Sequence, residues 1–209
     1  MAFRGWPAEA LEFFEGLAVD NSKAYWTAHK HIYDEKVHAP MAALVAELEP
    51  EFGAGKIFRP YRDVRFSADK SPYKTEIAAT LHEGGYIRLD AEGLGAGAGM
   101  YMMERDPLAR FRLAVDAEST GAALARVVAE LAGQKIDVRG HELLTRVPRG
   151  FAPDHPRADL LRCKGLVAWE QWPAGAWLGR ATARDRVVRF LRATRPLQEW
   201  LQTHVGHAD

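Results

Sequence analysis

Cysteine and long apolar runs are what this sequence has least of. Cys163 is the one cysteine among 209 residues, so no disulfide can form within the chain and no cysteine-based metal cluster can be built. No apolar stretch approaches the roughly 20 residues that a membrane helix needs, and the first residues contain no apolar segment typical of a secretory signal. We therefore expect a cytoplasmic protein that has no contact with a membrane.

The sequence patterns of several well-known catalytic and metal sites are also missing. The chain has no HExxH pair, no GxSxG elbow and no GxxxxGK[ST] phosphate loop. The glycines of residues 95–99 are a weak match to a nucleotide-binding loop, because a strand rather than a helix is expected after them. Close packing of a neighbouring helix against a glycine-rich strand explains them better. We expect no metal and no cofactor, and we expect Cys163 to be a small buried residue.

The remaining composition is that of an ordinary globular domain. Hydrophobic residues make up 47% of the chain and charged residues 27%, with 28 basic and 28 acidic side chains. These values are near the globular average and allow a sizeable core. A chain of this length fits a single domain, residues 1–209.

Residue periodicity predicts helices at both ends of the chain and a sheet between them. Apolar residues recur at helical spacing through residues 8–50, with a side-chain cap expected at residues 20–22. From Ile57 the period changes to two, which predicts an edge strand as far as Ser67, interrupted by Pro60, or else a strand that starts at Tyr61. Later elements are expected as strands over 75–81, 86–90 and 96–103, helices over 106–133, a strand over 166–172 and terminal helices divided at Pro196. The fold class is α+β, an antiparallel meander with helices at the N- and C-terminal ends.

Positive charge is concentrated in residues 56–75, although the whole chain is neutral. This segment has six lysines or arginines and only two aspartates. Residues 67–72 are rich in turn formers, which predicts a loop that carries part of this charge. The basic residues are Lys56, Arg59, Arg62, Arg65, Lys70 and Lys74.

Three groups of residues resemble a known family. The first reads Arg62-Asp63-x-Arg65-Phe66-Ser67-x-Asp69-Lys70-x-Pro72-Tyr73-Lys74. The second is Pro148-Arg149-Gly150-Phe151 followed by Asp154-His155-Pro156, and the third is Asn21 with Trp26. With these motifs the chain resembles an uncharacterised family of bacterial and fungal proteins that is catalogued as a domain of unknown function. The resemblance covers nearly the whole chain and implies a shared fold, but it implies no activity.

The basic segment is the first candidate site. Arginine has a planar fork that suits bidentate contacts with phosphate or carboxylate, and Tyr73 can add a hydroxyl or stack on a ring. The candidate ligand-binding residues are Arg62, Asp63, Arg65, Ser67, Asp69, Lys70, Tyr73 and Lys74, with Arg149 and His155 approaching them. The expected function is the binding of a small anionic ligand in a cationic pocket, with catalysis left open.

A structural role for the same residues is the first alternative. Asp63 and Asp69 can neutralise Arg65 and Lys70, which would make the motif an ion-pair knot in a structural or interaction module. Asp154 and His155 stand side by side, a pair that suits proton transfer, but Asp154 is better explained as the cap of a short helix after Pro156.

Nucleic-acid binding is the second alternative, from a different class of function. The expected C-terminal helix carries Trp177 and Phe190 among many arginines, which suits phosphate contacts and base stacking. A near-neutral isoelectric point and the absence of a recognised nucleic-acid module count against this interpretation. The arginines are Arg180, Arg184, Arg186, Arg189, Arg192 and Arg195.

Overall fold

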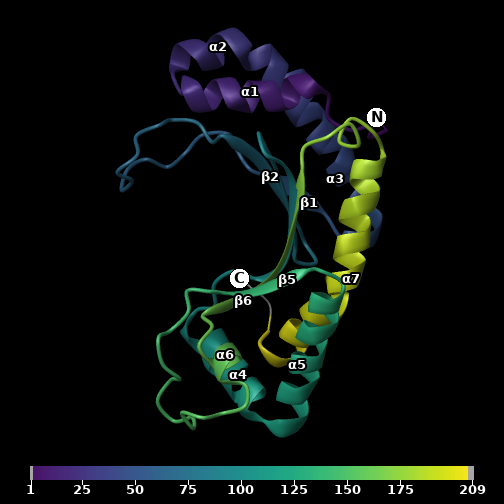
Figure 1. Cartoon of the computed structure of the whole chain (residues 1–209). Coiled ribbons are helices and arrows are strands. Elements are labelled where there is room, and N and C mark those ends of the chain that lie inside the picture. Colours follow the sequence, from purple (N-terminus) through teal and green to yellow (C-terminus); the bar gives the residue numbers. More distant parts are fainter. Residues whose placement is uncertain (1, 207–209) are drawn as a thin grey trace. The chain divides into compact units, whose positions relative to one another are not determined.

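A computed structural model describes residues 2–206 of the chain (Figure 1). These residues form two compact units. The first contains the residues up to Ala96 together with Gln171–Arg189, and the second contains Gly97–Glu170 together with the residues from Phe190 onward.

Helices form the N-terminal part of the first unit. They are α1 (Ala8–Val19), α2 (Lys23–Ile32), the π-helix η1 (Tyr33–His38) and α3 (Ala39–Phe52). The backbone N–H of Tyr25 donates to Ser22 Oγ over 3.1 Å, which confirms the expected side-chain cap of α2. Pro50 does not end the helix as the sequence suggested, because Leu48 and Phe52 on either side of it are buried and keep the last turn packed.

One sheet contains the six strands found among residues 2–206. They are β1 (Gly55–Ile57), β2 (Glu76–Leu81), β3 (Gly85–Asp90), β4 (Gly93–Met100), β5 (Asp137–His141) and β6 (Gly165–Pro173), in the order β1-β2-β3-β4-β6-β5. The pairs β1–β2, β2–β3 and β5–β6 are antiparallel. Two residues join β3 to β4, a connection that only an antiparallel hairpin permits. The α+β class and the meander of the first four strands are therefore confirmed.

The edge strand expected over residues 57–67 is wrong. Residues 58–75, the basic loop, extend from β1 and return to β2 without forming a strand (Figure 1). An isolated bridge between Tyr61 and Tyr73 closes the base of this loop. The alternation in the sequence failed as a signal because no face of the segment is buried, and Phe66 is 98% exposed.

The second unit packs helices around Phe111. These are α4 (Arg105–Asp116), α5 (Glu118–Gly133), the short α6 (Ala158–Leu161) and the later part of α7 (Thr182–His204). Trp200 meets Phe111 edge to face at 6.0 Å and donates its indole N–H to the carbonyl of Thr120. The helix break expected at Pro196 is wrong, because buried Leu191 and Leu197 flank the proline within one helix.

No helix within the described residues is long and apolar enough to cross a membrane.

The glycine-rich strand β4 lies tightly against β6. A Cβ added at Gly97 would lie 3.0 Å from the ring of Trp169, and one at Gly99 would lie 2.3 Å from the carbonyl oxygen of Leu166. Gly99 also has a φ of +127°, which favours glycine. The glycines do allow a close approach, but the partner is the neighbouring strand β6, so the helix expected to pack against them is wrong.

Candidate ligand-binding hollow

The base of the basic loop is fastened to the turn between α1 and α2 by Asn21. Asn21 Nδ2 donates to the carbonyl oxygen of Tyr73 over 3.1 Å, and the N–H of Tyr73 donates to Asn21 Oδ1 over 3.0 Å. The Tyr73 ring stacks on Trp26 with 4.4 Å between ring centroids and 6° between planes. Asn21 and Trp26 form a motif in the sequence, but nothing in the sequence indicates that they hold Tyr73.

Arg65 and Asp63 form a bidentate ion pair in the exposed part of the basic loop. Arg65 Nε lies 2.9 Å from Asp63 Oδ1, and Arg65 Nη2 lies 2.6 Å from Asp63 Oδ2. The hydrogen bonds from Arg65 hold the pKa of Asp63 below its usual range. Arg65 is therefore occupied within the loop.

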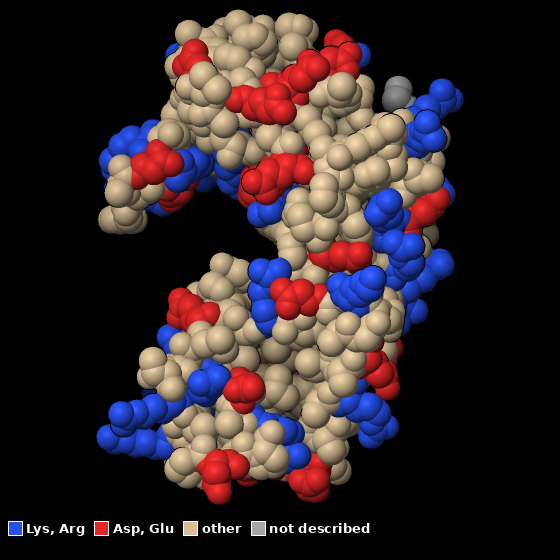
Figure 2. All heavy atoms as spheres, in the orientation of Figure 1, with Lys and Arg blue, Asp and Glu red and all other residues tan. Residues whose placement is uncertain are grey.

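A second ion pair crosses the same loop. Arg62 Nη1 donates to Asp69 Oδ2, and the N–H of Ser71 donates to Asp69 Oδ1 over 2.9 Å. The bond from Arg62 is the largest reason that the pKa of Asp69 lies well below its usual range, followed by the bonds from Ser71. Lys70 does not pair with Asp69 as the knot interpretation supposed, because its Nζ donates to the carbonyl of Val64 over 3.0 Å. Figure 2 shows basic and acidic atoms side by side over this loop.

A hollow of about 540 Å³ lies in the first unit beside the base of the basic loop. Its walls come from the end of α1 and the turn after it, from the loop, and from the start of β2. The lining residues are Ala18, Asn21, Arg62, Asp63, Asp69, Ser71, Tyr73, Lys74, Thr75 and Glu76. The hollow thus gathers Arg62, Asp63, Asp69, Tyr73 and Lys74 of the expected set. The expected residues Arg65, Ser67 and Lys70 lie elsewhere in the loop, and Arg149 and His155 belong to the second unit.

Lys74 and Glu76 are the two charged lining residues that the loop ion pairs leave out. The ammonium of Lys74 lies 5.2 Å from the centroid of the Phe58 ring, and no carboxylate of the described residues lies within ion-pair distance of it. Glu76 Oε2 comes no closer than 3.7 Å to Arg88 Nε, and that nitrogen lies nearer to Asp90, at 3.1 Å.

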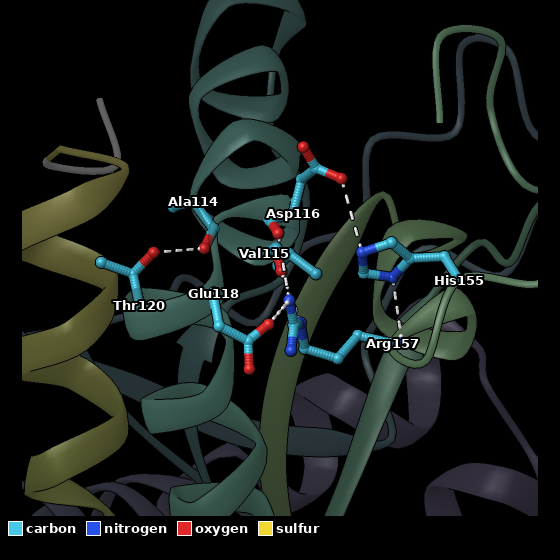
Figure 3. A network of polar contacts seen from close by, with 7 residues as sticks. All are labelled: Ala114, Val115, Asp116, Glu118, Thr120, His155 and Arg157. Atoms are coloured by element: carbon cyan, nitrogen blue, oxygen red, sulfur yellow. Dashed lines mark hydrogen bonds and ion pairs between the residues drawn. The ribbon is translucent and has the colours of Figure 1, made fainter. Parts of the chain in front are cut away.

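His155 lies at the C-terminal end of α4 in the second unit (Figure 3). Its side chain is 10% exposed, and its Nε2 lies 3.4 Å from Asp116 Oδ1. The N–H of Arg157 donates to His155 Nδ1 over 3.0 Å. Asp154 does not cap α6 as expected, because α6 has no side-chain cap and the imidazole takes this N–H instead.

Arg157 completes this connection to α4. Its Nε donates to the carbonyl of Val115 over 2.7 Å, and its Nη2 donates to the carbonyl of Asp116 over 3.0 Å (Figure 3). A cation at this position satisfies carbonyl groups that have no partner within the helix and interacts favourably with the helix dipole. The Asp154-His155-Pro156 motif therefore attaches the preceding irregular segment to α4.

The remaining candidates of the sequence are also placed. Cys163 is buried, as expected, and its Sγ donates to the carbonyl of Asp159 over 3.2 Å. Burial raises the pKa of its thiol to about 11. No group of three or more His, Cys, Asp or Glu within residues 2–206 is placed to hold a metal ion.

Two arginines of the expected nucleic-acid surface have partners within the first unit. Arg184 Nη1 lies 2.9 Å from Glu47 Oε2, and the guanidinium of Arg186 lies 4.4 Å from the Trp177 ring. Nucleic-acid binding through α7 stays an untested prediction.

The protein has an α+β fold with a long basic loop after the first strand. A family model described as "Conserved hypothetical protein (DUF2461)" matches residues 9–200. The chain belongs to this family, which confirms the expected domain of unknown function. The match extends over both units, and the single domain expected for residues 1–209 stays a prediction.

Comparisons with individual proteins add little to the family match. No curated protein matches the chain. Among solved structures, the chain is similar to a conserved hypothetical protein from Pyrococcus furiosus, with 11% identity and a TM-score of 0.40. The similarity covers 83% of this chain and 99% of the other.

Proposed function

We propose that the hollow beside the basic loop binds a small ligand through a carboxylate or phosphate group of that ligand. The observation that carries this proposal is the burial of Lys74 and the set of groups around its ammonium. Lys74 is half-buried and lines the hollow, and its ammonium lies 5.2 Å from the Phe58 ring with no carboxylate of the described residues within ion-pair distance. A lysine that is partly removed from water and lacks a counter-ion favours the binding of an anionic group.

Arg62 is the second cation on the wall. Its contact with Asp69 uses the Nη1 amino group, and a guanidinium has five N–H donors. The remaining donors of Arg62 are available to a ligand oxygen without loss of the ion pair. Thr75 adds a hydroxyl to the same wall.

Arg65 supports this site indirectly. Its ion pair with Asp63 lies within the basic loop and restricts the conformations of the loop. Fixing the loop before binding reduces the entropy that a ligand would otherwise have to offset. The ion-pair knot and the binding site are therefore parts of one proposal, to which we assign no reaction.

A thermal-shift and calorimetry screen tests the proposal. Phosphate, sulfate and simple carboxylates are expected to raise the melting temperature, because a ligand that binds only the folded state stabilises it. Lys74→Gln should weaken binding about tenfold or more. Lys70→Gln is the matched control, since that lysine contacts a carbonyl in the same loop and does not line the hollow.

Two results would overturn the proposal. One is that no anion in the screen binds the folded protein. The other is that Lys74→Gln and Lys70→Gln weaken binding to the same extent, which would indicate a general charge effect of the loop.

A further inference from the structure

We infer that the ligand is a zwitterion, an amino acid or a related amino carboxylate, rather than a simple anion. The inference rests on the proposed function and concerns the same hollow. It follows from the balance of charges among the lining residues, which include two cations, Arg62 and Lys74, and three carboxylates, Asp63, Asp69 and Glu76. A site for a simple anion would not be expected to present three carboxylates.

Two of these carboxylates are neutralised by arginines. Asp63 accepts two side-chain bonds from Arg65, and Asp69 accepts one from Arg62. With these two pairs set aside, one cation and one carboxylate remain on the wall. They are Lys74 and Glu76.

Glu76 shares its nearest arginine with a second carboxylate. Glu76 and Asp90 are opposite each other on β2 and β3, an arrangement of like charges that is unfavourable without a cation between them. Arg88 lies nearer to Asp90 than to Glu76. Asp90 Oδ1 also accepts the N–H groups of Glu92 and Gly93, at 2.9 and 3.1 Å. Glu76 is therefore the less satisfied member of the pair, and it is one of the residues that line the hollow.

The remaining charges are close together in the chain. Only Thr75 separates Lys74 from Glu76, and all three residues line the hollow. A ligand with a carboxylate at Lys74 and an ammonium at Glu76 would satisfy both groups. A simple anion would contact Lys74 but would also be repelled by the carboxylate of Glu76. The volume of about 540 Å³ falls within the range of small-molecule sites, roughly 300–1,000 Å³, and has room for an amino acid.

Calorimetry with matched ligands tests this inference. Each common L-amino acid is compared with the carboxylic acid that lacks its amino group and with the amine that lacks its carboxylate, such as alanine with propionate and ethylamine. We expect at least one amino acid to bind about tenfold more tightly than its matched acid, and the matched amine to bind more weakly than both.

Two variants identify the groups responsible. Glu76→Gln should reduce the affinity for the amino acid to that for the matched acid, while the acid binds as well as before or better. Lys74→Gln should weaken both. Circular dichroism checks that both variants are folded. Glu76→Gln also removes the repulsion between the carboxylates of Glu76 and Asp90.

The outcomes separate the inference from the proposed function. If the acids bind as tightly as the amino acids, the zwitterion is wrong and anion binding stands. If the affinity for the amino acid is unchanged in Glu76→Gln, the zwitterion is also wrong. If neither class binds, or the amines bind best, both proposals are wrong.

Discussion

Asn21 holds the backbone of Tyr73 with both polar atoms of its side-chain amide, across 52 positions of sequence. The amide takes the place that a neighbouring strand would occupy, since it accepts the N–H and donates to the C=O of the same residue. Tyr73 is also the residue whose ring stacks on Trp26 and whose bridge to Tyr61 closes the basic loop. One side chain thus fixes the base of the loop on which the hollow depends.

Asn21→Ala is expected to lower the free energy of unfolding by about 1–3 kcal/mol, because it leaves two partly buried backbone groups without partners. Urea unfolding followed by circular dichroism measures the change. Gln202→Ala, on the exposed side of α7, is the control and should change stability by less than about 0.5 kcal/mol. Equal effects of the two substitutions would show that the hydrogen bonds between Asn21 and Tyr73 contribute nothing to stability.

Tyr33 is expected to make stability depend on alkaline pH. Its hydroxyl is buried and has no hydrogen-bond partner within the described residues. Burial, and then the charges of Asp34 and Tyr61, raise its pKa to about 12. In the unfolded chain the pKa is about 10. The raised pKa therefore leaves the free energy of unfolding unchanged below about pH 10. That free energy falls as the pH rises from about 10 towards 12.

Tyr33→Phe should remove this loss, which amounts to about 2 kcal/mol near pH 12. At neutral pH the variant should be at least as stable as the original protein, because an unpartnered buried hydroxyl is gone. Urea unfolding at several pH values measures both effects. Tyr101→Phe, at an exposed ring, is the control, and the same pH profile for both variants would contradict the prediction.

Gly121→Ala is expected to destabilise the second unit, although alanine normally favours a helix by about 1 kcal/mol over glycine. An added Cβ would lie 2.1 Å from the carbonyl oxygen of Val115 and 2.5 Å from Arg157 Nε. Overpacking of this kind costs about 1–3 kcal/mol. Gly133→Ala at the end of α5 meets nothing within 4 Å and should be neutral or stabilising. Chemical denaturation distinguishes the two, and stabilisation by both would contradict the close approach of the Val115 carbonyl and Arg157 to Gly121.

Cys163 is expected to react slowly with iodoacetamide in the folded protein. It is buried, and its raised pKa leaves little thiolate near neutral pH. The alkylation rate should rise with urea in parallel with unfolding. A second thiol introduced by Ser119→Cys at an exposed position should react at once, and equally fast reaction of Cys163 in the folded state would contradict its placement.

Local periodicity was sufficient to predict much of the fold. The cap at Ser22 and the strands β2, β3 and β6 follow from patterns within a few residues, and these patterns agree with the burial observed. The strand expected over residues 57–67 shows the limit of this reasoning. Alternation indicates a strand only where one face is buried, and the sequence does not say whether Phe66 has a surface to pack against.

The candidate site was predicted as a segment but not as a set of contacts. Lys70 and Lys74 are equivalent in the sequence, yet one donates to a carbonyl and the other lines the hollow beside an aromatic ring. Asn21 gives no local signal that its partner is Tyr73. Such differences depend on how distant segments pack, which composition and spacing do not determine. Pro196 shows that the same limit applies to helices. Proline favours the start of a helix, but tertiary packing keeps Pro196 inside α7.

The most direct test of the central claim is amide chemical-shift mapping while acetate is added to isotope-labelled protein. If Lys74 receives an anionic group in the hollow, saturable shifts should appear at lining residues such as Ala18, Ser71 and Thr75 and should be lost in Lys74→Gln. Shifts that fail to saturate there, that survive in Lys74→Gln, or that gather at the arginines of α7 would contradict the claim.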